Sequence, residues 1–326
     1  MRLVVTGSIA TDCLMRFPGR FADQFVGDRL DRVSLSFLVD ELEIRRGGVA
    51  ANIAYGLAQL GLRPVLVGAV GKDFGEYRRW LDSHGVDTGS VLVAEELHTA
   101  RFLCTTDSDH NQIASFHAGA MSRARDIALA PMLRTGADLV VISPNDPEAM
   151  LRHTRDCRES GIPFVADPSQ QLAYVNGTQM RALIEGATWL FTNEYERELL
   201  LAGIGCTAED VLSRVGSWVT TLGADGVRVE SRGTEPIVVK AVTVEVVDPT
   251  GAGDAFRAGF LAGVEAGMGT ARSAQLGCVA ASFALESPGP QSYTIALTSL
   301  LSRLGAAYGH DAEIELAARV RPVRER

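Results

Sequence analysis

The segment DPTGAGDAFRAGF, which covers residues 248–260, places the small residues Gly251, Ala252 and Gly253 immediately before Asp254. Backbone N–H groups at the start of a helix bind anions, and small side chains let a phosphate approach the backbone closely. A carboxylate beside a bound phosphate is useful when the phosphoryl group is being transferred and its acceptor must lose a proton. The segment therefore predicts an anion site in which Asp254 is a general base.

The flanking residues indicate where this turn lies. VTVEVVD at 242–248 has the alternation of a strand, and AFRAGFLAGVEAG at 255–267 has the apolar spacing of a helix. The positive end of that helix should lower the pKa of Asp254 and keep it ionised. The alternative is structural, with glycine making the turn and Asp254 only favouring the helix dipole. The string matches neither G-x-x-x-x-G-K-[ST] nor G-x-G-x-x-G, which are common phosphate-binding fingerprints.

A second set of candidates lies near the N-terminal end. Asp12 follows an apolar strand, and one carboxylate can accept hydrogen bonds from both hydroxyls of a vicinal diol such as that of ribose. Gly48 and Asn52 open the next apolar helix, where bare backbone and an amide can approach the same sugar. The alternatives are an Asx turn at Asp12 and a helix cap near Gly48.

Asn193 and Glu196 form an N-x-x-E pattern after an apolar run. Asn at the N-cap with Glu three residues later is also the pattern of a capping box, which needs no ligand. A capped helix end in a cleft can still order water around Mg²⁺, so the two interpretations are compatible. Similarly, TLGADG at 221–226 is either a nucleotide loop or the turn of a hairpin at a strand end.

These residues must be positioned by the elements between them, and short apolar runs alternate with amphipathic stretches along the chain. Such alternation is typical of a doubly wound α/β fold, a mainly parallel sheet with helices on both faces. Ligands bind beyond the carboxyl ends of such strands, so Asp167, Asn193 and Thr221, which close three runs, are expected at a common cleft. The runs are RLVVTG (2–7), PVLVGAVG (64–71), ADLVVIS (137–143), IPFVADP (162–168), WLFTN (189–193) and WVTTLG (218–223), and the stretches include VAANIAYGLAQLG (49–61), DPEAMLRHTRDCRESG (146–161) and ALIEG (182–186).

Two segments interrupt the alternation. Residues 13–46 include the strand-like LSFLVDELEIRR and little helix, and residues 97–117 read as two strands around the polar turn 107–111. Together they predict a small β-sheet lid inserted into a single domain that spans residues 1–326. Phe102 and Phe116 lie in this lid, where phenylalanines in strands are usually core residues.

Composition limits the classes of function. The chain has 326 residues, of which 46% are hydrophobic and 22% charged, as in a soluble globular protein. A net charge of −9 argues against nucleic acid as a partner, because that affinity comes mainly from neutralising phosphates. The five scattered cysteines predict free thiols, and the N-terminal strand carries no signal-peptide pattern. We therefore expect a cytoplasmic protein that binds neither membrane nor nucleic acid.

Several segments together resemble the ribokinase (PfkB) family of sugar and nucleoside kinases. D-P-T-G-A-G-D-A-F-x-x-G at 248–259 resembles the C-terminal signature of this family, and GGVAANIA at 47–54 resembles the N-terminal one. Asn193 to Glu196 matches its N-x-x-E motif. The matches follow the order and spacing of the family, and the resemblance covers essentially the whole chain. Further segments resemble the actinobacterial adenosine kinases of the family, namely VTGSIATD (5–12), SLSFLVDELEIRRGG (34–48), TARF (99–102), QIASF (112–116) and DPSQQL (167–172).

The resemblance implies a ribokinase-like fold and roles for individual residues. Asp254 would be the base for a primary hydroxyl that attacks the γ-phosphate of ATP, and Glu196 would tune Mg²⁺ through water. The resemblance assigns the anion hole to Gly251, Ala252 and Gly253; the acceptor sugar to Asp12, Gly48 and Asn52; the acceptor adenine to Phe102 and Phe116 with Ser8, Ser36, Gln170 and Gln171; and ATP to Asn193, Thr221, Leu222, Gly223, Ala224 and Gly226.

The resulting expectation is an ATP-dependent adenosine kinase of purine salvage that uses Mg²⁺ and forms a homodimer through its lid. ESPGPQSY at 286–293 lies where many relatives hold a monovalent cation, so K⁺ is a further expected cofactor. The runner-up is a sugar kinase acting on ribose, fructose or a similar acceptor. A non-catalytic nucleoside or sugar sensor is disfavoured by the intact Gly-Ala-Gly-Asp. A dinucleotide-dependent oxidoreductase is disfavoured because TGSIATD at 6–12 lacks the glycine fingerprint.

Overall fold

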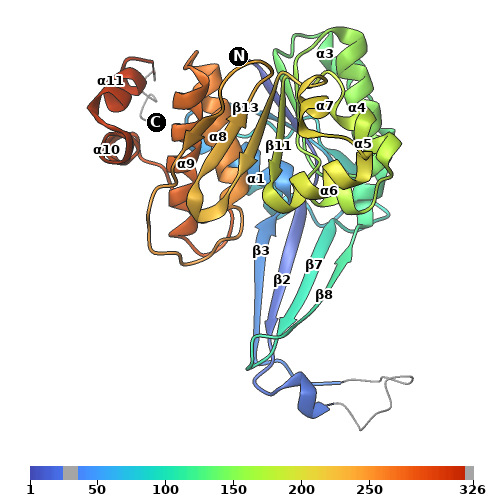
Figure 1. Ribbon diagram of the computed structural model, residues 1–326. Helices are drawn as coiled ribbons and strands as arrows, with labels where there is room; N and C mark the ends of the chain where they lie inside the picture. The colour runs from blue at the N-terminus through green and yellow to red at the C-terminus, as the bar shows by residue number, and fades with distance from the viewer. Residues whose placement is uncertain (25–35, 320–326) are drawn as a thin grey trace.

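The computed structural model describes residues 1–24 and 36–319, and its largest element is an eight-stranded sheet (Figure 1). The strand order is β14-β13-β12-β11-β10-β9-β1-β4, parallel from β12 to β4 and antiparallel across β12, β13 and β14. The mainly parallel sheet is thus confirmed. Its strands are β1 (Leu3–Thr6), β4 (Val65–Val67), β9 (Leu139–Ile142), β10 (Phe164–Ala166), β11 (Trp189–Asn193), β12 (Ser217–Thr221), β13 (Val227–Glu230) and β14 (Ile237–Val239).

Helices cover both faces of this sheet (Figure 1). Successive residues of β1 point to opposite faces, so Leu3 and Val5 belong to one core cluster and Val4 to another, which is why the run is apolar throughout. On the first side lie α1 (Val49–Gln59), α2 (Gly75–Ser83), α8 (Ala252–Glu265) and α9 (Thr270–Leu285), joined by α10 (Leu297–Tyr308) and α11 (His310–Arg319). On the second lie α3 (Ala130–Leu133), α4 (Pro147–Ser160), α5 (Gly177–Ile184), α6 (Glu194–Ile204) and α7 (Ala208–Leu212).

A four-stranded sheet projects from one end of the body as a narrow lid (Figure 1). Its order is β3-β2-β7-β8, from β2 (Ala10–Arg16), β3 (Glu41–Gly47), β7 (Ala100–Thr106) and β8 (Gln112–His117). The two strands expected within 97–117 are confirmed. The segment expected at 13–46 supplies most of β2 and β3, and its residues 25–35 lie outside the described residues.

Smaller elements complete the fold. A two-stranded sheet pairs β5 (Ala69–Gly71) with β6 (Leu92–Ala94) beside the base of the lid. The short 3-10 helices are η1 (Phe21–Gln24), η2 (Gly119–Asp126), η3 (Ser169–Ala173) and η4 (Gly223–Asp225). Within the described part of the chain, no helix is both long and apolar enough to cross a membrane.

One expected strand is wrong. Residues 242–248 form no strand, because the chain leaves the sheet after β14 and crosses beside α9 instead of running along another strand. The N–H groups of Val247 and Asp248 both donate to the carbonyl of Leu285 at the end of α9. The backbone of this segment is therefore held by the end of α9, while Val246 and Val247 stay exposed. The loop before α8 follows an irregular segment.

Candidate active site

Residues 248–254, here called the anion loop, have the backbone geometry that their small side chains predict. Gly251 is the N-cap of α8 with φ of 80°, a left-handed conformation that favours glycine. A Cβ there would also lie 2.4 Å from Cβ of Pro290. Among the described residues, the N–H groups of Gly253 and Asp254 have no protein acceptor. Two donors at the positive end of a 14-residue helix remain for an anion, as a transferring phosphoryl group requires.

Asp254 lies at this helix end and contacts α1. Its Oδ2 accepts a hydrogen bond from Nδ2 of Asn52 at 2.8 Å. Although the side chain keeps partial exposure, surrounding protein raises the pKa of Asp254 to about 7, against the opposing charge of Arg257 and the Asn52 hydrogen bond. The lowered pKa expected from the helix end is therefore wrong, because desolvation outweighs the dipole. A carboxylate with this pKa is a stronger base near neutral pH than an ordinary aspartate.

A buried ion pair lies beneath the loop. Arg257, one helical turn after Asp254, donates from Nη2 to Oδ1 of Asp167 at 2.6 Å and from Nη1 to the carbonyl of Gly253 at 3.0 Å. Asp167 is completely buried, so this strand-end carboxylate braces the loop and does not line an open cleft as expected. Sequence reasoning missed Arg257, although a lone arginine within the apolar string AFRAGF was a signal that it has a buried partner.

The lid places four side chains in one row at its base. Asp12 is paired with Arg45 on β3 and with Phe102 on β7, and Phe102 is paired with Phe116 on β8. Directly paired residues point to the same face of a sheet, so a carboxylate and two aromatic rings share one surface. Phe116 is 51% exposed, which excludes a simple core role for it. Burial raises the pKa of Asp12 to about 6, against the opposing charge of Arg45.

The start of α1 adjoins this row. Gly48 is its N-cap with φ of 94°, and a Cβ there would lie 2.6 Å from the backbone of Ser8 and Ala10. The hydroxyl of Ser8 accepts a hydrogen bond from the N–H of Val49 at 3.0 Å, so Ser8 caps the helix. Asn52, one turn further on, links this end of α1 to Asp254. The sugar candidates and the candidate base therefore meet on one helix.

The remaining acceptor candidates are less closely grouped. Gln170 is exposed and Gln171 half-buried on η3, directly after Asp167. Ser36 is exposed, and its neighbour Phe37 packs on Phe17 and Phe21, beyond the end of β2 farthest from the body. Ser36 thus lies apart from the other candidates.

Asn193 and Glu196 form the capping box. Oδ1 of Asn193 accepts from the N–H of Glu196 at 2.8 Å, and Oε2 of Glu196 accepts from the N–H of Asn193 at 2.8 Å. The hydroxyl of Ser169 donates to the other carboxylate oxygen at 3.0 Å. The structural interpretation of this motif is confirmed, while a contribution to Mg²⁺ stays a prediction.

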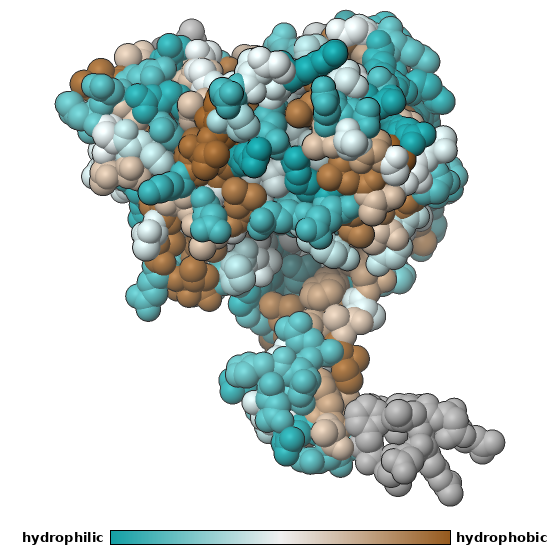
Figure 2. All heavy atoms as spheres, in the orientation of Figure 1, coloured by the Kyte–Doolittle hydropathy of each residue, from teal (hydrophilic) through white to brown (hydrophobic). Residues whose placement is uncertain are grey.

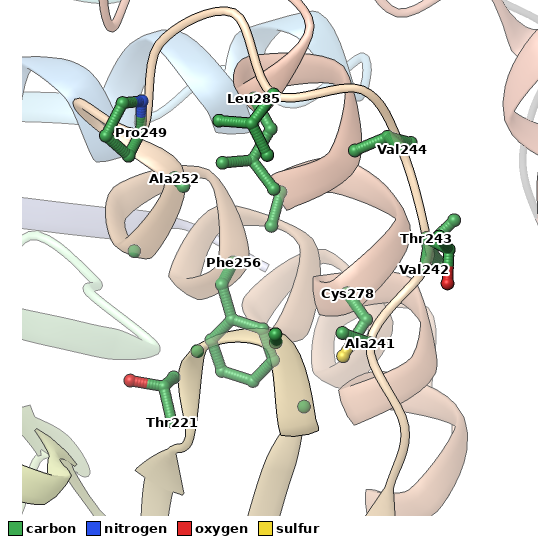
Figure 3. Close-up of a pocket in the computed structure, with 16 residues that line it drawn as sticks. Thr221, Ala241, Val242, Thr243, Val244, Pro249, Ala252, Phe256, Cys278 and Leu285 are labelled. Atoms are coloured by element: carbon green, nitrogen blue, oxygen red, sulfur yellow. The ribbon is translucent and has the colours of Figure 1, made fainter.

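A cavity of about 480 Å³ lies beside the anion loop (Figure 3). The expected nucleotide residues Thr221, Gly223, Ala224 and Gly226 line it, together with Ala252 and Gly253 of the loop. Leu222 and Asn193 do not. Sequence reasoning missed most of the apolar wall, which comes from Ala241, Val242, Thr243, Val244, Val246, Pro249, Phe256, Cys278, Ala281 and Leu285.

Asp248, the first residue of the loop segment, is tied to the lid. Its Oδ2 accepts from Nη1 of Arg45 at 2.5 Å and from the N–H of Gly289 at 3.0 Å. Its Oδ1 accepts from the N–H of Thr250 at 2.8 Å. Residues 286–293 therefore contact the loop, and the use of K⁺ there stays a prediction.

Known proteins identify the class to which this fold and site belong. The family described as pfkB family carbohydrate kinase matches residues 3–296, which is most of the chain. The chain therefore belongs to the PfkB family of carbohydrate kinases, which have the ribokinase-like fold.

Three relatives illustrate the similarity. The nucleoside kinase of Methanothermobacter thermautotrophicus is 30% identical over 88% of this chain and 93% of its own length. The structure of Burkholderia thailandensis nucleoside kinase in complex with inosine is 33% identical, with a TM-score of 0.83 over 94% of this chain and 98% of that one. The nucleoside kinase structure from Methanocaldococcus jannaschii is 26% identical, with a TM-score of 0.83 over 94% and 99%.

Proposed function

We propose that the protein transfers the γ-phosphoryl group of ATP to the 5′-hydroxyl of a nucleoside, and that adenosine is the preferred acceptor. The observation that carries this proposal is the row of Asp12, Phe102 and Phe116. Neighbouring strands lie about 4.8 Å apart, so the two rings stand roughly 5 and 10 Å from the carboxylate. A ribose diol held at Asp12 leaves room for an attached base at the rings, whereas a free sugar would leave Phe116 uncovered.

The chemistry follows from the arrangement of the loop. Asp254 accepts the proton of the 5′-hydroxyl, and the N–H groups at the start of α8 stabilise charge on the phosphoryl oxygens. Arg257 holds the loop in place through the carbonyl of Gly253. The cavity beside the loop fits ATP, because its apolar wall suits a base and its loop end offers the free N–H donors.

Magnesium fits the site as a companion of ATP. Among residues 1–24 and 36–319, no group of three His, Cys, Asp or Glu side chains is placed to hold a metal ion. Mg²⁺ prefers to keep several waters and to bind phosphates, and it neutralises phosphate charge during transfer. Glu196, already hydrogen-bonded through both oxygens, would contribute through a bound water.

The acceptor is tested by ADP release with adenosine, inosine, guanosine, ribose and fructose. Base stacking on an aromatic ring is worth on the order of 1–3 kcal/mol by alanine substitution. We therefore expect adenosine to exceed ribose by at least about 10²-fold in kcat/KM. Phe102→Ala and Phe116→Ala should each lower kcat/KM for adenosine while barely changing the residual activity on ribose.

Phe37→Ala is the matched control, because Phe37 packs at the outer end of the lid and away from the row. It should loosen the lid without discriminating between acceptors. Equal losses for adenosine and ribose in the Phe102 and Phe116 variants would refute the stacking role. Ribose or fructose as the best acceptor of the unmodified protein would favour the sugar kinase, and binding without ADP release would favour a sensor.

We also propose a homodimer formed by the outer face of the lid. Leu42, Ile44 and Ile113 are 61%, 66% and 46% exposed and lie on the face opposite the Asp12 row, as the register requires. Hydrophobic residues are visible on the narrow stalk of the lid in Figure 2. A second copy can cover this face, since exposed apolar sheet faces are normally buried against a partner.

Sedimentation or light scattering at micromolar concentration should show a dimer, and Ile44→Glu should dissociate it. Burying an unpaired carboxylate in an apolar interface costs several kcal/mol. Val238→Glu is the control, because Val238 is 64% exposed on the edge strand β14 of the main sheet. A monomeric unmodified protein, or equal dissociation by both variants, would contradict a lid-mediated dimer.

A further inference from the structure

Four hydrogen bonds connect the candidate base to a buried glutamine in the loop after α9. Nε2 of Gln291 donates to Oδ1 of Asn52 at 2.9 Å and to the hydroxyl of Tyr77 at 2.5 Å. The Tyr77 hydroxyl donates to the carbonyl of Gly47 at 2.9 Å, and Nδ2 of Asn52 donates to Asp254 at 2.8 Å. This hydrogen-bond network joins α1, α2 and α8 to the loop after α9.

The donor and the acceptor of every hydrogen bond in this network are fixed. A carbonyl can only accept, so the Tyr77 proton must point to Gly47, and the Tyr77 oxygen is left to accept from Gln291. Gln291 must then present its NH₂ group to both neighbours, which leaves Asn52 with its Oδ1 toward Gln291. The NH₂ group of Asn52 is thereby aimed at Asp254, where it favours an ionised carboxylate, which is acceptor-only.

We propose that Gln291 is a positioning residue, which fixes the amide of Asn52 so that it donates to Asp254 and keeps the candidate base ionised. This inference rests on the proposed function only in taking Asp254 as the base. Without the Gln291 donor, Asn52 can invert its amide and offer an oxygen to Asp254. That orientation favours the protonated carboxyl group, which cannot accept the acceptor's proton.

The burial of Gln291 supports a specific role. Its side chain is 4% exposed, and among the described residues its Oε1 has no hydrogen-bond donor. An unpaired buried oxygen destabilises the fold, and this cost accompanies the two hydrogen bonds that the NH₂ group of Gln291 donates. Its neighbour Pro290 packs where a side chain of Gly251 would be, so the same segment adjoins the anion loop and orients the amide beside the base.

Other groups also act on the pKa of Asp254, and the test must leave them unchanged. Arg257 on α8 lowers it, and the carboxylates of Asp167 after β10 and Glu196 on α6 raise it. The hydroxyls of Tyr77 on α2 and Tyr293 have pKa values raised by burial, so both stay neutral across the working range. Replacing Gln291 alters none of these charges.

The experiment compares kcat/KM for the best acceptor, from about pH 5.5 to 9, in the unmodified protein and in Gln291→Met. We expect the acidic limb to move up by about one pH unit, which is roughly a tenfold loss near pH 6 and less than threefold near pH 9. Gln291→Glu should move it at least as far while its carboxylate is ionised, because that group accepts from Asn52, inverts the amide and adds a negative charge near Asp254. Ser299→Ala, an exposed residue on α10 outside this segment, should change nothing. A loss of equal size at every pH, or no loss, would overturn the proposal.

A measurement without turnover separates this inference from the proposed function. The ¹³Cγ resonance of Asp254, assigned with Asp254→Asn in aspartate-labelled protein, reports its pKa directly. A pKa raised in Gln291→Met supports the positioning role even if Asp254→Asn proves active and the base assignment fails. An unchanged pKa refutes the positioning role whatever the activity. If Gln291→Met does not fold, Gln291→Leu supplies the same comparison, because it also removes the donor without adding a charge.

Discussion

Asp254→Asn should lower kcat by at least about 10²-fold, the usual scale of general acid–base catalysis. The amide has the shape of the carboxylate, and its oxygen can still accept the hydrogen bond from Asn52, so the loop should keep its conformation. What the variant loses is the basic oxygen that takes the acceptor's proton. Steady-state kinetics with saturating acceptor and ATP measures kcat, and calorimetric titration of each ligand should show far smaller changes in affinity.

The control for this prediction is Asp126→Asn, which alters an exposed carboxylate that forms a surface ion pair with Arg123. It should leave kcat unchanged. If Asp254→Asn turned over as fast as the unmodified protein, the loop would act by positioning and electrostatics alone. Asp254 would then have the structural role of an acidic residue in the first turn of a helix.

The parts of the fold that could be predicted are those that contiguous residues determine. Apolar runs such as LVVT are buried on both faces, and that requirement fixes their composition locally. The same is true of the anion loop, because Gly251 must have a positive φ and bear no side chain against Pro290. The lid strands also followed from local alternation around the polar turn at Asp107.

The parts that were not predictable depend on distant contacts and on burial. VTVEVVD alternates as a strand does, but its last N–H groups donate to Leu285 at the end of α9, a residue distant in sequence. The pKa of Asp254 depends on how much protein surrounds the carboxyl group. The position of Asp254 at a helix end does not reveal that burial. Gln291 and Asn52 are hydrogen-bonded although they are 239 residues apart in the sequence, and no local pattern predicts that contact.

Breaking the ion pair between Arg257 and Asp167 should have the largest effect on stability. Both side chains are buried, with 8% and 0% of their side-chain surface exposed. Arg257→Met would leave the Asp167 carboxylate without a partner, and removing one member of a buried pair typically costs about 3–5 kcal/mol. Urea unfolding at neutral pH should show this loss in the free energy of unfolding, and Asp167→Leu should show one of similar size, because a buried guanidinium is then unpaired.

The double variant Asp167→Leu, Arg257→Met is the decisive comparison. Replacing a buried ion pair by apolar residues of similar volume is often neutral or stabilising, so the double variant should recover most of the stability that each single variant loses. Activity should not recover with it, because Gly253 loses the hydrogen bond that holds the anion loop and Asp254 loses the nearby cation that opposes its protonation. If the two single losses simply added, the pair would not be energetically coupled. If the double variant regained both stability and activity, Arg257 would be a packing residue, and the conformation of the loop would depend on its glycines alone.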